Sequence, residues 1–257
     1  MSMPNENQAG LQKSRNTKKN AAYFDELVKF FESDPTETLA KLYSFPVYVP
    51  RQVIEDFLSR YELFRLIHPI QGDILEFGTF NGGGAFSFGH FTTIIEPQNL
   101  TRKIVTFDTF SGFPSTSEGD AKGNSDLVKV GGLKSRPLNR MEAARDLWDT
   151  NRFISHVPKM EIVAGDIMNT LDTFLDEFPH TLPALLYMDF DLFEPTAHVL
   201  RKLLPRMQKG SVIAFDELNH PAFPGETLAF LQEMVAGEIT VRRVPFSSRI
   251  SYVQIGH

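Results

Sequence analysis

The chain has 257 residues, of which 26 are basic and 32 acidic, so its net charge is −6, and 42% of its residues are hydrophobic. These values fit one large globular domain with a smaller addition. The absence of cysteine excludes disulfide scaffolds, thiolate metal sites and cysteine nucleophiles. No apolar run reaches the ~20 residues of a membrane helix, and no secretory signal is apparent. We expect a cytoplasmic protein that binds neither membranes nor, given its acidic body, nucleic acid.

The first seventy residues divide into two segments. Residues 1–20 are polar and hold four basic side chains against one acidic, which predicts a disordered basic arm. Residues 21–70 show apolar side chains at helical spacing. We expect one helix to restart at Pro35 and end at Pro46, and a longer helix to begin at Pro50. These helices predict an N-terminal cap or lid, and their aromatic faces favour a homo-oligomer, a dimer or higher.

In residues 71–257, short apolar runs alternate with amphipathic segments. This pattern predicts an α/β domain with a mainly parallel sheet. The expected strands are Ile74–Phe77, Ile104–Phe107, Glu161–Ala164, Ala184–Met188 and Val212–Phe215, with helices near 84–95, 139–151, 169–178, 196–207 and 226–236. Two further runs, Ile239–Val244 and Ile250–Ile255, predict a terminal antiparallel hairpin. The arrangement resembles the seven-stranded, Rossmann-like fold of class I S-adenosylmethionine-dependent methyltransferases.

A glycine-rich turn follows the first predicted strand. Its residues include Glu76, Gly78, Thr79, Asn81 and Gly82. Glycines let a ligand approach the backbone, and the next helix offers free N–H groups. Dinucleotides, phosphates and S-adenosylmethionine are all bound in this way, so the turn alone does not choose among them. Its spacing matches neither G-x-G-x-x-G nor a P-loop.

The residues that follow the second and third predicted strands indicate which kind of ligand the turn binds. Asp108 follows the second strand, where an acid can accept both hydroxyls of an adenosine ribose. Gly165 and Asp166 follow the third strand, where a carboxylate can meet the adenine amino group. Each acid alone could be a helix cap. Because ligands of open α/β sheets bind at the carboxyl edge, the three strand ends together predict a nucleoside cofactor site.

Four acids follow the fourth and fifth predicted strands: Asp189, Asp191, Asp216 and Glu217. Acids after fully apolar strands are costly to hold together unless a cation or protons neutralise them. Oxygen-only ligands suit Mg²⁺ or Mn²⁺. Strand alternation places Asp189 and Asp191 on one side if the strand continues. It separates Asp216 from Glu217, so the chain must curl there for both to bind one ion.

Other functions are compatible with parts of this pattern. Asp189-Phe190-Asp191 is also typical of metal-dependent glycosyltransferases, in which such a pair holds a metal on a nucleotide diphosphate. That interpretation leaves the glycine turn and the acids after the fifth strand unexplained. A non-catalytic binding protein of the same fold, and a methyltransferase for a non-sugar diol, are further alternatives.

Several runs of the chain are similar to the macrocin O-methyltransferase family, over roughly residues 40–255: PRQVIEDFLSRYELF, LEFGTFNGGG, TFDTFSGFP, YMDFDLFEPT and FDELNHPAFPGE. Members are metal-dependent and methylate deoxysugar hydroxyls, and some are dTDP-6-deoxy-L-hexose 3-O-methyltransferases. The resemblance implies that Glu76, Gly78, Asp108 and Asp166 hold S-adenosylmethionine. It further implies that Asp189, Asp216 and Glu217 bind Mg²⁺. The chain departs from some relatives at Leu192, where they have a histidine base, and at Glu217, where they have aspartate.

The expected reaction is methyl transfer to the hydroxyl of a deoxysugar that is nucleotide-linked, such as a dTDP-6-deoxyhexose, or part of a glycoside. Asp191 is the expected general base and His220 the reserve candidate. Tyr187 and Trp148 are expected in the core. A diphosphate-bearing substrate needs basic groups, for which the candidates are Arg51, Arg60, Lys122, Lys129, Lys134, Arg136 and Arg140.

Overall fold

The computed structural model describes residues 18–123, 125–234 and 236–256, and the chain divides into two compact units, Met1–Phe57 and Leu58–His257. The division falls inside helix α5 (Arg51–Ile67), so the second half of that helix belongs to the larger unit. The predicted basic arm lies outside the described residues up to position 17. Its last three residues begin helix α2 (Lys18–Ser33). None of the described helices combines the length and apolar content of a membrane span.

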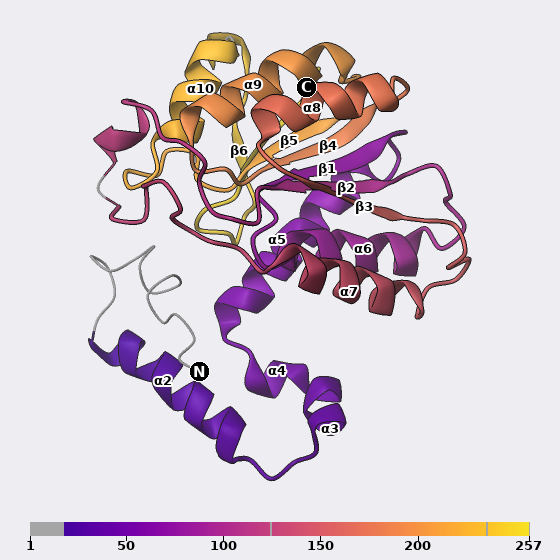
Figure 1. Ribbon diagram of the computed structural model, residues 1–257, viewed down its shortest axis with the longest axis vertical. Coiled ribbons are helices and arrows are strands. Elements are labelled where there is room, and N and C mark those ends of the chain that lie inside the picture. The colour runs from indigo at the N-terminus through magenta and orange to yellow at the C-terminus, as the bar shows by residue number, and fades with distance from the viewer. Residues whose placement is uncertain (1–17, 124, 235, 257) are drawn as a thin grey trace. The chain divides into compact units, whose positions relative to one another are not determined.

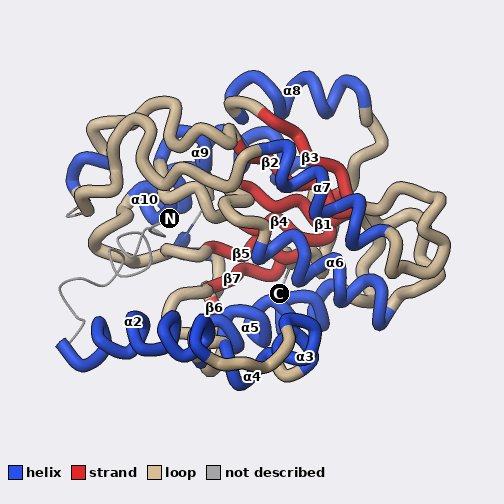
Figure 2. The backbone as a smooth tube through the Cα atoms, turned by 60° about the horizontal axis from the view of Figure 1, so that its bottom comes forward, coloured by secondary structure: helices blue, strands red, loops and turns tan. Residues whose placement is uncertain are grey.

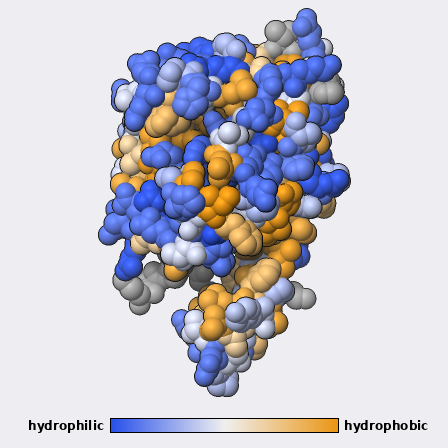
Figure 3. Space-filling view, turned by 90° about the vertical axis from the view of Figure 1, so that its right-hand side faces the viewer, coloured by the Kyte–Doolittle hydropathy of each residue, from blue (hydrophilic) through white to orange (hydrophobic). Residues whose placement is uncertain are grey.

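The N-terminal unit consists of α2, α3 (Thr38–Tyr43), α4 (Phe45–Tyr48) and the start of α5. The buried Lys41 ammonium donates to the carbonyls of Phe31 (2.6 Å) and Asp34 (2.9 Å), which closes the turn between α2 and α3. The second helix starts at Thr38, not at Pro35, because Asp34 accepts the Thr36 N–H and holds a turn there. The prediction that Pro46 ends a helix is wrong. Pro46 lies in the first turn of α4, where its missing N–H costs nothing. Apolar side chains gather on the surface of this unit (Figure 3).

The larger unit contains one seven-stranded sheet in the order β3-β2-β1-β4-β5-β7-β6. Strands β1 to β5 are parallel, and β7 runs antiparallel to both of its neighbours. Figure 2 shows the strands following one another in this order across the molecule. The predicted α/β fold is therefore confirmed. The strands are β1 (Asp73–Phe77), β2 (Ile104–Asp108), β3 (Met160–Ala164), β4 (Pro183–Met188), β5 (Val212–Phe215), β6 (Arg242–Arg243) and β7 (Ser251–Gln254).

Helices cover both faces of the sheet (Figure 1). On one face α8, α9 and α10 pack over a core that includes Phe77, Phe107 and Phe215. On the other face α6, α7 and the second half of α5 pack over Ile74, Tyr187 and their neighbours. Strands buried on both faces are continuously apolar, as expected for a parallel sheet. These helices are α6 (Gly83–Ile95), α7 (Leu138–Asp149), α8 (Ile167–Glu177), α9 (Phe193–Leu203) and α10 (Gly225–Glu233), with short 3₁₀ turns η1 (Asp120–Lys122), η2 (Leu204–Arg206) and η3 (Ala236–Glu238).

The terminal hairpin forms, but its first strand is shorter than predicted. Only Arg242 and Arg243 pair with β7, and η3 precedes them. This strand lies at the edge of the sheet, where short, charged strands are usual because they discourage pairing with other chains. β7 itself is inserted between β5 and β6, with Phe215 opposite Ser251. The segment just before Ser251 is thereby brought to the carboxyl end of β5.

A buried arginine, Arg102, holds the segment that leads from α5 into β1. The Arg102 Nε–H donates to Glu96 (2.9 Å), and its remaining N–H groups donate to the carbonyls of Gly72 (2.8 Å) and Ile70 (2.8 Å). Arg102 and Glu96 are both almost fully buried at the side chain. This arginine therefore connects the loop before β2 with the chain that leaves α5 and enters β1.

Candidate active site

The glycine turn after β1 is built by close contact with the end of β4. Gly78 has a φ of +91°, and a side chain there would overlap the carbonyl oxygen of Asp189. Gly82 has a φ of +88° and immediately precedes α6. Both positions require glycine, because other residues strain at such angles. The Thr79 hydroxyl pairs with that of Thr106 on β2, whereas Asn81 is exposed.

Glu76 lies beneath this turn and is buried. The Thr106 hydroxyl donates to its Oε2 (2.9 Å), and a side chain at Gly84 would overlap its Oε1. Burial raises the pKa of Glu76 to about 7, although the charge of Arg60 opposes the shift. A carboxyl group that titrates near neutrality therefore faces the first turn of α6.

Asp108 connects the end of β2 to the two segments around it. Its carboxylate accepts the N–H groups of Phe80 (2.8 Å) and Phe110 (2.6 Å) and the hydroxyl of Ser135 (3.1 Å). Burial raises its pKa, and the backbone hydrogen bonds oppose the shift. The predicted ribose acid thus lies beside the glycine turn, as the strand order requires, and it also organises the turn.

Asp166 caps a helix in this structure. It precedes α8, and its Oδ1 accepts the Met168 N–H (3.0 Å). Gly165, with a φ of +134°, donates its N–H to the Asp108 carbonyl (2.9 Å). The ends of β2 and β3 are therefore adjacent. Asp166 both caps α8 and lies at the same carboxyl edge of the sheet as Asp108.

Four acids gather where β4 and β5 end. Asp191, Asp216 and Glu217 are buried and Asp189 is half-buried. Burial raises the pKa of Asp189 well above its ordinary value, and repulsion from Asp216 raises it further. Burial also raises the pKa of Asp191 well above its ordinary value, and repulsion from Glu217 and then Asp216 raises it further. The strand does not continue to Asp191, because β4 ends at Met188 and Asp191 has a φ of +62°.

Arg249 supplies positive charge to this cluster. Its Nη1 contacts both Asp216 Oδ2 and Glu217 Oε1 (3.2 Å for the latter). Both carboxylates therefore face the same group, because the chain bends at Asp216 and Glu217 after β5. Tyr187, otherwise a core residue, donates its hydroxyl to Asp216 Oδ1 (2.7 Å). Within the described residues, no three acidic or histidine side chains are already arranged around one point as metal ligands.

His220 lies at the margin of the acidic cluster. Its Nδ1 is 3.5 Å from Glu217 Oε2 and accepts the Ala222 N–H (3.3 Å). Its side chain is 21% exposed. A histidine with this exposure can exchange protons with solvent, whereas Asp191 is buried among the acids.

Two charged residues of this site were not predicted. Arg249 lies in the loop between the hairpin strands, and only the antiparallel insertion of β7 beside β5 brings it to Asp216. Glu226 is fully buried at the start of α10, and its carboxylate accepts the N–H of Glu217 (3.0 Å). The sequence offered one sign of Glu226, an acid in the first turn of an otherwise apolar helix. Exposed acids are also common at this position, so the sign does not identify a buried residue.

The basic candidates fall into two groups. The side chains of the long β2–α7 segment are exposed, as for ordinary solvated charges: Lys122, Lys129, Lys134, Arg136 and Arg140. Arg51 is exposed and pairs with Glu55. Arg60 differs, because its guanidinium lies 5.4 Å from the centre of the Tyr187 ring and its charge acts on Glu76. Trp148 is buried against Gly89, as expected for a core residue.

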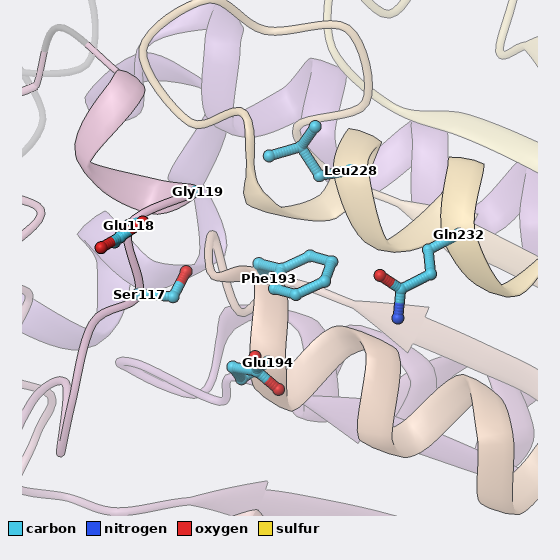
Figure 4. A pocket seen from close by; sticks show the side chains of 7 residues that line it. All are labelled: Ser117, Glu118, Gly119, Phe193, Glu194, Leu228 and Gln232. Carbon is cyan, nitrogen blue, oxygen red and sulfur yellow. The ribbon is translucent and has the colours of Figure 1, made fainter.

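A pocket of about 350 Å³ opens beyond the start of α9. Ser117, Glu118 and Gly119 form one side, Leu228 and Gln232 of α10 lie opposite, and the Phe193 ring lies between them (Figure 4). None of the predicted cofactor or metal residues lines it. Asp120 supports its wall, because its carboxylate accepts the N–H groups of Ser117 (2.7 Å) and Phe193 (2.7 Å).

The model of the macrocin O-methyltransferase family matches residues 64–223, which include all four acids and the glycine turn. The chain belongs to this family. As an O-methyltransferase it uses S-adenosylmethionine.

Solved structures agree with this assignment. The O-methyltransferase is 30% identical to CalS11, described as a calicheamicin methyltransferase, with a TM-score of 0.90 over 96% of this chain and 97% of that one. An apo structure of CalS11, described as a TDP-rhamnose 3′-O-methyltransferase, gives a TM-score of 0.81 at 30% identity over 95% and 97%. The O-methyltransferase NovP, at 18% identity, 81% coverage of each chain and a TM-score of 0.58, shares the fold. Comparison with curated proteins finds no match.

Proposed function

We propose that this enzyme transfers a methyl group from S-adenosylmethionine to a hydroxyl of a nucleotide-linked deoxysugar, with Mg²⁺ at the acidic cluster. The likeness to CalS11, whose substrate is described as TDP-rhamnose, supports the sugar nucleotide, since it extends over nearly the full length of both chains. The proposal includes a cytoplasmic location and a homo-oligomer. Exposed apolar side chains of the N-terminal unit, such as Leu42 and Tyr43, would suit contact with a second copy.

The chemistry of the donor set fits a hard divalent cation. Asp189, Asp216 and Glu217 offer only oxygen atoms, and burial together with the nearby charge of Asp216 raises the pKa of Asp189. Arg249 already brings one positive charge to Asp216 and Glu217, and Asp189 has no such ion pair among the described contacts of Arg249. A bound Mg²⁺ would supply a Lewis acid that favours ionisation of a sugar hydroxyl.

The chain's own residues have separate roles in this proposal. Glu76, Asp108 and the turn from Gly78 to Gly82 bind and orient the cofactor, with Gly165 and Asp166 next to its adenine. Asp191 accepts the proton of the sugar hydroxyl at a carboxylate oxygen, and His220 is the reserve candidate for this role. Tyr187 holds Asp216 in place through a hydrogen bond, and Arg249 does so through an ion pair.

Calorimetry with S-adenosylhomocysteine, with and without Mg²⁺, tests cofactor binding, and a methyl-transfer assay in the same two conditions tests the metal. We expect cofactor binding in both conditions and methyl transfer only with Mg²⁺. A panel of dTDP- and GDP-linked deoxysugars then tests the substrate. The charge reversal Arg136→Glu should raise KM for a nucleotide-linked sugar, and an unchanged KM would remove this residue from diphosphate recognition. Full activity after complete removal of divalent ions would reject the metal.

A further inference from the structure

Three consecutive residues at the start of α10, Gly225, Glu226 and Thr227, all contact the loops that carry the acids. We refer to them as the α10 clamp. Glu226 is fully buried, and its Oε2 accepts the Glu217 N–H (3.0 Å) while its Oε1 accepts the Asp191 N–H (3.4 Å). One carboxylate therefore ties the loop after β4 to the loop after β5.

The neighbours of Glu226 contact the same two loops. The Thr227 hydroxyl accepts the Asn219 N–H (2.7 Å) beyond β5. Gly225 is pressed against the loop after β4, so that a side chain at this position would lie 2.5–2.6 Å from backbone atoms of Asp191, Leu192 and Phe193. Real side chains do not approach backbone this closely, so α10 can dock here only with glycine.

The loops need such support because two of their residues adopt unfavourable angles. Asp191 has a φ of +62° and Asn219 a φ of +64°. Non-glycine residues persist in this region only where their surroundings hold them, and they cluster at active sites. Each of these two residues donates its N–H to the α10 clamp.

We propose that the α10 clamp is a positioning element, in which Glu226 and Thr227 hold Asp191 and Glu217 in the arrangement that methyl transfer requires. This inference rests on the proposed function, because it takes Asp191 as the base. Glu226 itself does not touch substrate in this scheme. Its effect on the reaction passes through the backbone of the two loops.

The variant Glu226→Gln tests the clamp at nearly constant volume. An amide offers one acceptor oxygen, so one of the two N–H groups loses its partner. We expect kcat to fall about ten-fold or more, with KM for S-adenosylmethionine changed by less than about two-fold. Hydrogen exchange of the free protein should become faster in residues 189–193 and 216–220 and stay unchanged in β2. The control Glu233→Gln, on the same helix in an ion pair with Arg201, should leave both measurements as in the wild type.

Two further variants keep the test decisive if Glu226→Gln does not fold. Thr227→Val removes the acceptor for Asn219 and should lower kcat, while Thr227→Ser retains the hydroxyl and should restore it. Unchanged kcat per folded molecule in Thr227→Val, or unchanged exchange of both loops, would overturn the clamp. Exchange is measured without substrate, so it still reports on the loops if the wild type methylates no sugar. If the wild type methylates no sugar, the proposed function is rejected, and the α10 clamp then has no role in catalysis.

Discussion

Tyr187 and Asp216 are joined by a hydrogen bond of 2.7 Å from the hydroxyl to Oδ1, although the tyrosine ring is completely buried within the sheet. Tyr187 lies on β4 opposite Ala214 on β5, so its hydroxyl reaches the residue that follows β5. The ring contributes to the core, and only its outer atom takes part in the site. A residue can therefore belong to the core and still determine where a carboxylate points.

The variant Tyr187→Phe should separate these two contributions. It keeps the ring and leaves buried Asp216 without one donor, which should lower the free energy of unfolding by ~1.5–3 kcal/mol. Urea denaturation at neutral pH measures the loss. Tyr252→Phe, on the half-buried face of β7, is the control and should change stability by less than about 0.5 kcal/mol. Equal effects of the two variants would mean that the hydroxyl does not support Asp216.

Asp108→Asn should weaken binding of S-adenosylhomocysteine about ten-fold or more, corresponding to ~1.4 kcal/mol. The amide group places a donor where the carboxylate now accepts N–H groups from both sides. Isothermal calorimetry measures the affinity. Asp73→Asn is a matched control, because Asp73 also accepts a backbone N–H, from Lys103 (2.8 Å), but at the start of β1. Wild-type affinity in Asp108→Asn would exclude this residue from the cofactor site.

Glu76 should make stability depend on pH in a defined direction. The unfolded chain releases this proton near pH 4.5, whereas the folded protein keeps it up to about pH 7. Between these values the folded state binds more protons, so the free energy of unfolding falls as pH rises, by about 3 kcal/mol in all. The full contribution is present below pH 4.5 and is lost above about 7.

The variant Glu76→Gln removes this proton and isolates its effect. Other buried acids, such as Asp189, Asp191 and Glu226, have pKa values raised in the same direction, so the wild type alone does not resolve one group. Urea denaturation of both proteins from pH 5 to 8 should show a smaller decline for Glu76→Gln. Parallel curves would contradict the assigned pKa.

Arg102→Met should destabilise the larger unit by ~3–5 kcal/mol, because it leaves the buried Glu96 carboxylate without its ion-pair partner and four backbone carbonyls without this donor. Arg65→Met provides the comparison, since Arg65 pairs with Glu62 at the surface. Exposed pairs contribute only ~0.2–1 kcal/mol. Thermal and urea unfolding of both variants measure the difference, and similar losses would show that burial of the Arg102 pair carries no extra stability.

Local pattern was sufficient to predict the sheet and the residues that directly follow its strands. Apolar runs with period-two or continuous character identify β1 to β5, and the order of strands in an α/β sheet then brings Gly78, Asp108 and Asp189 to one edge. The direction of the last two strands also followed from their short connection. These features depend on neighbours within a few residues or on general rules of topology.

Contacts between distant segments could not be predicted in this way. Arg249 lies 32 residues beyond Glu217, and its contact depends on the register of β7 beside β5. In the sequence Glu226 looks like an exposed acid in the first turn of a helix. It is buried because Gly225 lets α10 approach the loop after β4. Asp191 leaves the strand at a positive φ that periodicity does not encode.

The antiparallel placement of β7 has a consequence for how the protein is made. During synthesis the acids at 189 to 217 leave the ribosome before Arg249 and β7, and β7 must then fold back between β5 and the edge strand β6 to bring Arg249 to them. Until that moment a nascent chain carries a concentrated negative charge at an incomplete sheet edge. This part of the sheet can therefore be completed only after β7 has been synthesised.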